Sequence, residues 1–121
     1  MKRVLVAAER RTTRASLLAL LETEPDLEPA GEAAALPAAI RQLRALRPEI
    51  LLVDRRLLGG AGLPRLPMLA WGAVDTAIVV VGMGDHPGLD AYAREAGAAG
   101  YLRLDEAAER VSSVVSSPPA A

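Results

Sequence analysis

Short apolar runs and segments of helical periodicity alternate along the chain of 121 residues. Strands that are buried on both faces are predicted over residues 3–7, 49–54 and 77–81, because each range contains an unbroken apolar run. Weaker strands are predicted over residues 27–31 and 100–104. Pro29 lies inside the first of these two, and because proline cannot donate a ladder hydrogen bond, that strand is expected at an edge of the sheet.

The segments between the strands predict helices, because their apolar residues recur at helical spacing. These segments start at Thr12 or Thr13, near Leu36, at Met68, at Pro87 and at Asp105. We expect Thr12 or Thr13 to cap the first helix and Asp105 to cap the last, since their side-chain oxygens can accept bonds from unpaired backbone N–H groups.

Strands that alternate with helices require crossover connections and therefore a parallel sheet. Five such units predict a single α/β domain with a doubly wound five-stranded sheet. Residues 1–116 are expected to form this domain, and residues 117–121 are expected to be a flexible tail or the start of a linker.

Composition narrows the function classes. Hydrophobic residues make up 51% of the chain and charged residues 24%, which is typical of a globular protein. The lack of cysteine excludes disulfides, thiolate zinc sites and cysteine nucleophiles. The net charge of −1 does not favour binding to nucleic acid. No apolar run reaches membrane-spanning length and the first residues resemble a strand more than a signal peptide, so no membrane partner and a cytoplasmic location are expected.

Acidic residues follow two of the predicted strands. Asp54 ends the run over residues 50–53, ahead of a glycine-rich loop, and Glu9 follows the first strand. In doubly wound sheets, ligands bind beyond the carboxyl ends of the strands, so we expect the two carboxylates to lie next to each other there. The sequence shows no pairing of a nucleophile with a base and no cofactor fingerprint, so an enzyme is not expected.

Three stretches resemble a known family, the receiver domains of bacterial two-component response regulators. They are "EPDLEPAGEA", "LRALRPEILLVD" and "REAGAAGYL", and they look closest to receivers that precede a helix-turn-helix output domain. The resemblance implies a flavodoxin-like sheet in the order 2-1-3-4-5. It also implies that a histidine kinase transfers a phosphoryl group to the aspartate that ends the third strand, which is Asp54 here.

Other positions of the family's site depart from its pattern. Receivers usually carry two acids after the first strand, a hydroxyl after the fourth and a lysine after the fifth. The corresponding positions here are Ala8 with Glu9, Gly82, and Leu104. By resemblance, Glu9, Asp54 and the backbone carbonyl of Arg56 are candidate ligands for weakly bound Mg²⁺, and Tyr101 is the switch position. Arg10, Arg55 and Arg56 are candidates to reach the site from loops, whereas Arg103 is expected to face away from position 104.

The resulting hypothesis is an atypical receiver domain in signal transduction or transcription control, with weak or absent phosphorylation at Asp54. Its expected partners are a histidine kinase or another signalling protein. A homodimer through residues 89–115 is also expected, and contact with DNA only through an output domain outside this chain. The alternatives are a pseudo-receiver that senses a small molecule or only binds proteins, and a conventional phosphoacceptor with a degraded but working site.

Overall fold

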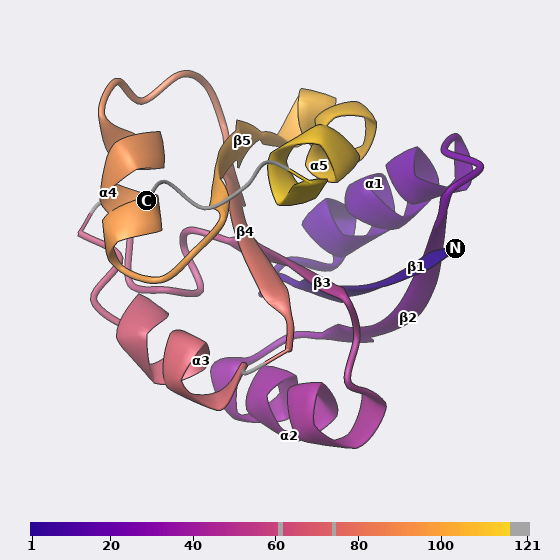
Figure 1. The fold of residues 1–121 in the computed structure, drawn as a ribbon, viewed down its shortest axis with the longest axis horizontal. Helices are drawn as coiled ribbons and strands as arrows, with labels where there is room; N and C mark the ends of the chain where they lie inside the picture. Colours follow the sequence, from indigo (N-terminus) through magenta and orange to yellow (C-terminus); the bar gives the residue numbers. More distant parts are fainter. Residues whose placement is uncertain (61, 74, 117–121) are drawn as a thin grey trace.

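The computed structural model describes residues 1–60, 62–73 and 75–116 (Figure 1). Strands and helices alternate as the apolar pattern predicts. Their bounds are β1 (Lys2–Ala7), α1 (Arg11–Glu22), β2 (Leu27–Ala33), α2 (Leu36–Leu46), β3 (Ile50–Asp54), α3 (Leu66–Gly72), β4 (Ala77–Gly82), α4 (Leu89–Glu95), β5 (Gly100–Arg103), the 3₁₀ turn η1 (Leu104–Glu106) and α5 (Ala107–Ser116). Residues 117–121, predicted to be a tail or linker, lie outside the described residues.

The five strands form one parallel sheet in the order β2-β1-β3-β4-β5, which confirms the expected topology. Strand β2 is at the edge, as Pro29 predicts. Pro29 lies opposite Val4, and the next pair joins Leu5 to Gly31, so the register shifts by one residue directly after the proline. A break in pairing at that point is expected where the strand lacks a donor.

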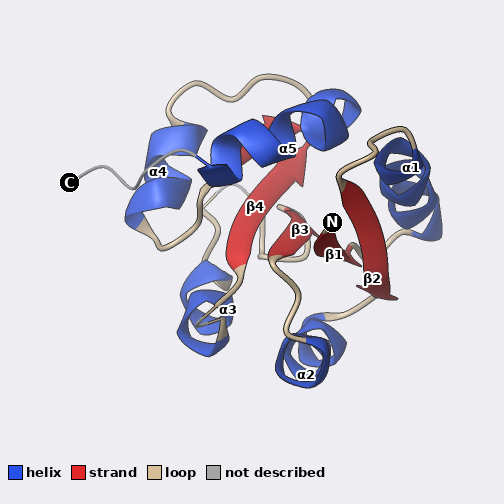
Figure 2. Ribbon diagram, turned by 45° about the vertical axis from the view of Figure 1, so that its right-hand side comes forward, coloured by secondary structure: helices blue, strands red, loops and turns tan. Residues whose placement is uncertain are grey.

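Helices cover both faces of the sheet, with α1 and α5 on one face and α2, α3 and α4 on the other (Figures 1 and 2). Alternate strand residues serve the two layers, because successive side chains of a strand point to opposite faces. Leu51 and Val53 pack with the α2–α4 layer, whereas Ile50 and Leu52 pack with the α1–α5 layer.

Both predicted helix caps are wrong. Helix α1 follows Arg10 without a side-chain capping bond, and the two threonines lie inside its first turn. Helix α5 begins at Ala107, after a 3₁₀ turn that contains Asp105, and β5 ends one residue earlier than expected, at Arg103. Glu106 replaces Asp105 at this chain reversal, since its carboxylate accepts a hydrogen bond of 3.4 Å from the backbone N–H of Arg103.

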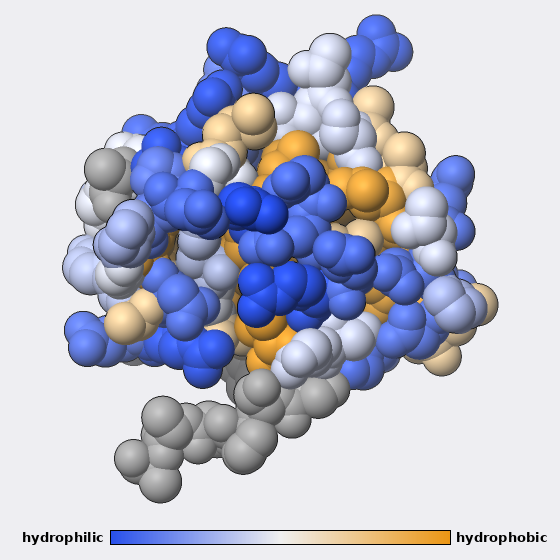
Figure 3. All heavy atoms as spheres, turned by 90° about the horizontal axis from the view of Figure 1, so that it is seen from above, coloured by the Kyte–Doolittle hydropathy of each residue, from blue (hydrophilic) through white to orange (hydrophobic). Residues whose placement is uncertain are grey.

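The apolar residues that suggested self-association through residues 89–115 are largely buried in the core. Leu89 and Ala93 of α4, and Ala107, Ala108 and Val111 of α5, pack against the sheet. Viewed from above Figure 1, hydrophilic residues cover most of the molecular face and hydrophobic residues show only as small areas between them (Figure 3). Ala-rich composition in these helices therefore reflects close packing on the sheet. None of the described helices is long and apolar enough to cross a membrane.

Candidate functional site

The carboxyl ends of four strands meet at one edge of the sheet and bring the predicted site positions together. Ala7 pairs with Val53, so Ala8 and Asp54 follow side by side. Asp54 in turn pairs with Val81, next to Gly82. Gly82 pairs with Arg103, so Leu104 follows at the same edge. The parallel register therefore assembles Ala8, Asp54, Gly82 and Leu104, as the resemblance to receiver domains implies.

Asp54 is the one buried polar side chain among the described residues, with a relative exposure of 6%. Its Oδ1 accepts a hydrogen bond of 3.1 Å from the backbone N–H of Arg56. The Asp54 carbonyl accepts a second bond, from the N–H of Leu57, as the chain turns away from β3. No other described donor reaches the carboxylate, so one of its oxygens is open to a partner from outside the protein.

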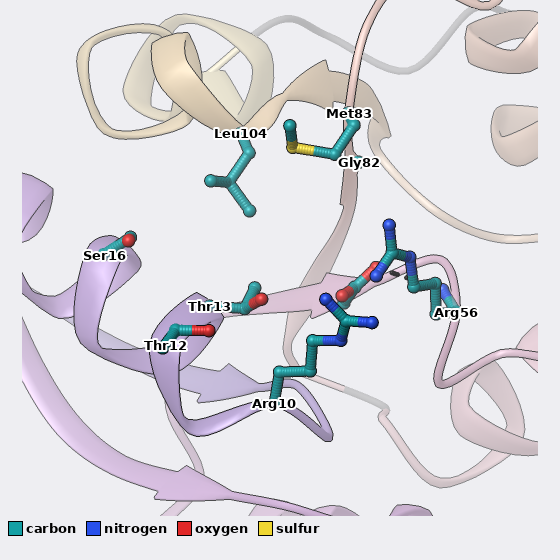
Figure 4. A pocket seen from close by; sticks show the side chains of 9 residues that line it. Arg10, Thr12, Thr13, Ser16, Arg56, Gly82, Met83 and Leu104 are labelled. Carbon is teal, nitrogen blue, oxygen red and sulfur yellow. Dashed lines mark hydrogen bonds between the residues drawn. The ribbon is translucent and has the colours of Figure 1, made fainter.

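A pocket of about 290 Å³ lies beside Asp54 (Figure 4). The start of α1 supplies one side of it, the loop after β3 supplies another, and the ends of β4 and β5 close it. The described residues that line it are Arg10, Thr12, Thr13, Ser16, Asp54, Arg56, Gly82, Met83 and Leu104. In Figure 4 the guanidinium groups of Arg10 and Arg56 point toward each other from these two sides of the pocket.

The charges that line the pocket favour anions over cations. Asp54 is the only acid among the described lining residues, and Arg10 and Arg56 contribute two positive charges, so the formal sum is +1. Neither guanidinium forms an ion pair with a described residue. Among the three arginines proposed to reach the site, Arg10 and Arg56 therefore do so, whereas the Arg55 side chain lies against Gly82.

Glu9, a predicted metal ligand, is exposed and is absent from the described lining of the pocket. Its loop is held by Arg14, whose Nη1 donates hydrogen bonds of 2.9 Å to the carbonyl of Ala8 and 3.0 Å to that of Glu9. The same Arg14 forms an ion pair of 2.9 Å with Glu32 on β2. Arg14 thereby ties the loop between β1 and α1 to the edge strand.

These residues fit Mg²⁺ poorly. Mg²⁺ requires near-octahedral oxygen ligands and is usually bound through one or two carboxylates plus waters. Here Asp54 supplies one carboxylate, and the Arg56 carbonyl already accepts a hydrogen bond of 3.2 Å from the N–H of Gly59. Two guanidinium groups share the pocket with that carboxylate. In the described part of the chain, no three His, Cys, Asp or Glu side chains are grouped as a metal site requires.

Leu104 and Arg103 have different surroundings, because β5 ends at Arg103 and Leu104 begins the 3₁₀ turn η1. Leu104 lines the Asp54 pocket. Arg103 instead forms ion pairs of 3.3 to 3.6 Å with three carboxylates, those of Asp85, Asp105 and Glu106. Because these acids already engage its guanidinium, Arg103 does not provide the positive charge that a lysine at position 104 would place beside Asp54.

Tyr101 is buried, and its hydroxyl donates a hydrogen bond of 2.9 Å to the carbonyl of Gly84. The His86 ring packs edge-on against it at 5.6 Å between centroids. A Cβ atom at position 82 would lie only 2.8 Å from the Tyr101 hydroxyl oxygen, so the absence of a side chain at Gly82 makes room for this position. Burial is the main reason that the pKa of Tyr101 is raised, and nearby Arg55 partly opposes the effect.

Sequence reasoning missed the three hydroxyl groups that line the pocket and one of its apolar residues. The sequence suggested Thr12 and Thr13 only as caps of the first helix and assigned no role to Ser16 or Met83. The spacing of Thr12 and Ser16, four residues apart, was an available signal, because such residues lie on one face of a helix. That this face meets the end of β4 depends on the crossover of the chain.

Comparison with known proteins agrees with this fold. The response regulator UvrY of Escherichia coli O6:H1 is 29% identical over 114 residues, which cover 94% of this chain and 52% of UvrY. The signal receiver domain of NarL from Mycobacterium tuberculosis superposes with a TM-score of 0.80 at 24% identity, covering 97% of this chain and 98% of that domain. A LuxR-family two-component response regulator from Aurantimonas also has a TM-score of 0.80, at 23% identity, covering 95% and 85% of the two chains. No family model matches the sequence.

The chain is homologous to the response regulator UvrY and has the fold of a receiver domain. It spans about half the length of the curated relatives that it matches. In this chain, Asp54 occupies the end of β3 and Tyr101 lies on β5, whereas Ala8, Gly82 and Leu104 bring neither a carboxylate, a hydroxyl nor an ammonium group to the edge of the sheet.

Proposed function

We propose that this receiver domain acts in two-component signal transduction and that Asp54 accepts a phosphoryl group slowly or not at all. The observation that carries the proposal is the composition of the Asp54 pocket. The described lining has one carboxylate, two exposed guanidinium groups, and Gly82 and Leu104 at the ends of β4 and β5.

Phosphoryl transfer depends mainly on positioning and on stabilisation of negatively charged oxygens. The loss of one pre-positioned electrostatic donor commonly lowers the rate of an enzyme by about 100- to 1000-fold. Gly82 and Leu104 each lack such a donor. Arg10 and Arg56 carry positive charge but are exposed to solvent, which screens their effect on Asp54. We therefore expect residual phosphorylation at most.

We further propose that the domain signals through protein contacts rather than by catalysis. A structure of similar fold, CheY6 of R. sphaeroides, was solved in complex with the P1 domain of CheA3 and has a TM-score of 0.79 at 19% identity. By analogy, a histidine kinase or another signalling protein is the expected partner. The cytoplasm is the expected location, and contact with DNA would require an output domain outside this chain.

The test is the mass of the intact protein after incubation with acetyl phosphate and Mg²⁺. We expect little or no phosphoryl mass on the unmodified domain and none on Asp54→Asn. The double variant Ala8→Asp with Leu104→Lys should label faster, because it adds a carboxylate and an ammonium group at the end of the sheet where Asp54 lies. Gly82 is left unchanged, because a side chain there would collide with Tyr101.

A matched control is Ala91→Asp with Ala45→Lys, which makes the same charge changes at exposed positions of α4 and α2. Urea unfolding should first establish that each variant is folded, since Ala8 is fully buried. Rapid labelling of the unmodified domain, at a rate that the Ala8→Asp/Leu104→Lys variant does not exceed, would contradict the proposal of a weak site.

A second candidate function is the sensing of a small molecule. The observation in its favour is the net positive charge of a pocket whose other wall, formed by Met83 and Leu104, is apolar.

A further inference from the structure

Five donor side chains from two separate segments line the Asp54 pocket (Figure 4). The donors are the guanidinium groups of Arg10 and Arg56 and the hydroxyls of Thr12, Thr13 and Ser16. Serine and threonine inside helices often bond back to a carbonyl of the preceding turn. Here none of these three hydroxyls has a hydrogen bond to another described residue, and neither guanidinium does. All five donors are therefore available to a ligand.

The buried carboxylate of Asp54 adds an acceptor at the same place. It is 94% shielded from solvent and accepts only one hydrogen bond from the described residues, on Oδ1. Burying a carboxylate is costly unless its remaining lone pairs find donors. A ligand with a hydroxyl group could donate to the free oxygen while its anionic group binds the arginines. A divalent cation in the pocket would be repelled by the positive charges of Arg10 and Arg56.

The far wall of the pocket is apolar. Leu104 is half-buried, and Met83 has 65% of its surface exposed although it is a large hydrophobic residue. Covering such surface with an apolar group is favourable, because the group removes both surfaces from water. The volume of about 290 Å³ is at the lower end of the range of small-molecule pockets, about 300 to 1000 Å³.

We propose that this pocket binds a small hydroxylated organic anion with an apolar part. The anionic group, a carboxylate or a phosphate, is held between Arg10 and Arg56, because guanidinium groups bind both anions through paired hydrogen bonds. The ligand hydroxyl donates to Asp54, and the apolar part lies against Met83 and Leu104. The inference rests on the proposed function in one respect: Mg²⁺ must not occupy the site.

The experiment is a titration followed by ¹H–¹⁵N NMR, with mandelate as the probe. Mandelate combines a carboxylate, a hydroxyl and a phenyl group. Phenylacetate lacks the hydroxyl, 1-phenylethane-1,2-diol lacks the charge, and phenyl phosphate lacks the hydroxyl and carries a phosphate in place of the carboxylate. We expect saturable shifts of the amides around Arg10 and Asp54 with mandelate, at least threefold weaker binding of phenylacetate and no saturation with the diol. The comparison of phenylacetate with phenyl phosphate, which both lack the hydroxyl, identifies the preferred anion.

Arg10→Gln combined with Arg56→Gln should weaken mandelate binding at least tenfold. The matched control is Arg11→Gln with Arg41→Gln, which removes two positive charges from exposed arginines outside the described lining, and should change affinity less than twofold. Asp54→Asn should reduce the preference for mandelate over phenylacetate.

Absence of saturable binding by mandelate and phenyl phosphate, or an equal loss in the two double variants, would overturn the inference. A separate titration with MgCl₂ distinguishes the two proposals. Saturable shifts at Asp54 with a dissociation constant below about 1 mM for Mg²⁺ would overturn the proposed weak metal site. This constant corresponds to a binding free energy of about −4 kcal/mol. Failure of the anions alone would leave that proposal standing and reject only the ligand.

Discussion

Gly82 determines where the Tyr101 side chain can lie, and replacing it by alanine tests this dependence. A Cβ atom at position 82 would be 2.8 Å from the Tyr101 hydroxyl oxygen and 3.0 Å from Cδ of Arg55. The first separation is shorter than any ordinary contact of a methyl group, so the hydroxyl must move. It cannot move freely, because the tyrosine is buried and its hydroxyl is bonded to the carbonyl of Gly84.

The expected magnitude follows from three contributions. Forcing a methyl group into a packed region typically costs about 1 to 3 kcal/mol. Loss of the Tyr101–Gly84 hydrogen bond costs about 1 kcal/mol more if the hydroxyl is displaced. Alanine restricts the unfolded chain, which offsets about 0.4 to 1 kcal/mol. We therefore expect Gly82→Ala to lower the free energy of unfolding by about 1 to 3.5 kcal/mol.

The assay is urea unfolding followed by far-ultraviolet circular dichroism. The variants are Gly82→Ala, Tyr101→Phe and the two combined. Tyr101→Phe alone should cost about 1 kcal/mol, and in its presence Gly82→Ala should cost almost nothing, because the colliding oxygen is gone. The sum of the losses in free energy of unfolding of the two single variants should thus exceed the loss in the double variant by at least about 1 kcal/mol.

Gly62→Ala serves as the control, because nothing lies within 4 Å of a Cβ atom at that position. It should leave stability unchanged or raise it slightly. If Gly82→Ala behaves like this control, or if its effect adds to that of Tyr101→Phe within about 0.5 kcal/mol, the argument that Gly82 makes room for Tyr101 is refuted.

Three further predictions concern pH, the backbone and assembly. Burial raises the pKa of Tyr101, so its neutral phenol should stabilise the folded state fully below about pH 10, and this contribution should be lost as pH rises toward the folded pKa. The urea midpoint of unfolding should therefore fall with rising pH in this range, and it should fall less in Tyr101→Phe. Arg47 ends α2 with a φ of 44°, so Arg47→Gly should raise the free energy of unfolding by about 1 kcal/mol, whereas Arg44→Gly, inside the helix, should lower it by about as much. Because the apolar residues of segment 89–115 are largely buried, self-association through this segment should be weak: light scattering should detect it only at high concentration, and a monomer at every concentration would contradict it.

The alternation of apolar runs with helical segments was enough to predict the sheet, its edge strand and the place of Asp54. Strands buried on both faces need apolar residues throughout, and Ile50 to Val53 form such a run. The chain must then turn where the run ends, at Asp54. Pro29 marks the edge strand because it cannot donate a hydrogen bond. These features depend on local chemistry, so the order of residues along the chain is sufficient to reveal them.

Only the tertiary structure decides which side chains face Asp54. Glu9 and Arg10 are neighbours in the loop after β1, yet Arg10 lines the pocket and Glu9 is absent from its described lining. That choice depends on how α1 begins and on Arg14, which fixes the loop by bonding to its carbonyls. Thr12 and Ser16 likewise reach the pocket only because the crossover places α1 beside the ends of β3 and β4. The charge of a site is a sum over residues distant in sequence, so it is determined when the chain folds.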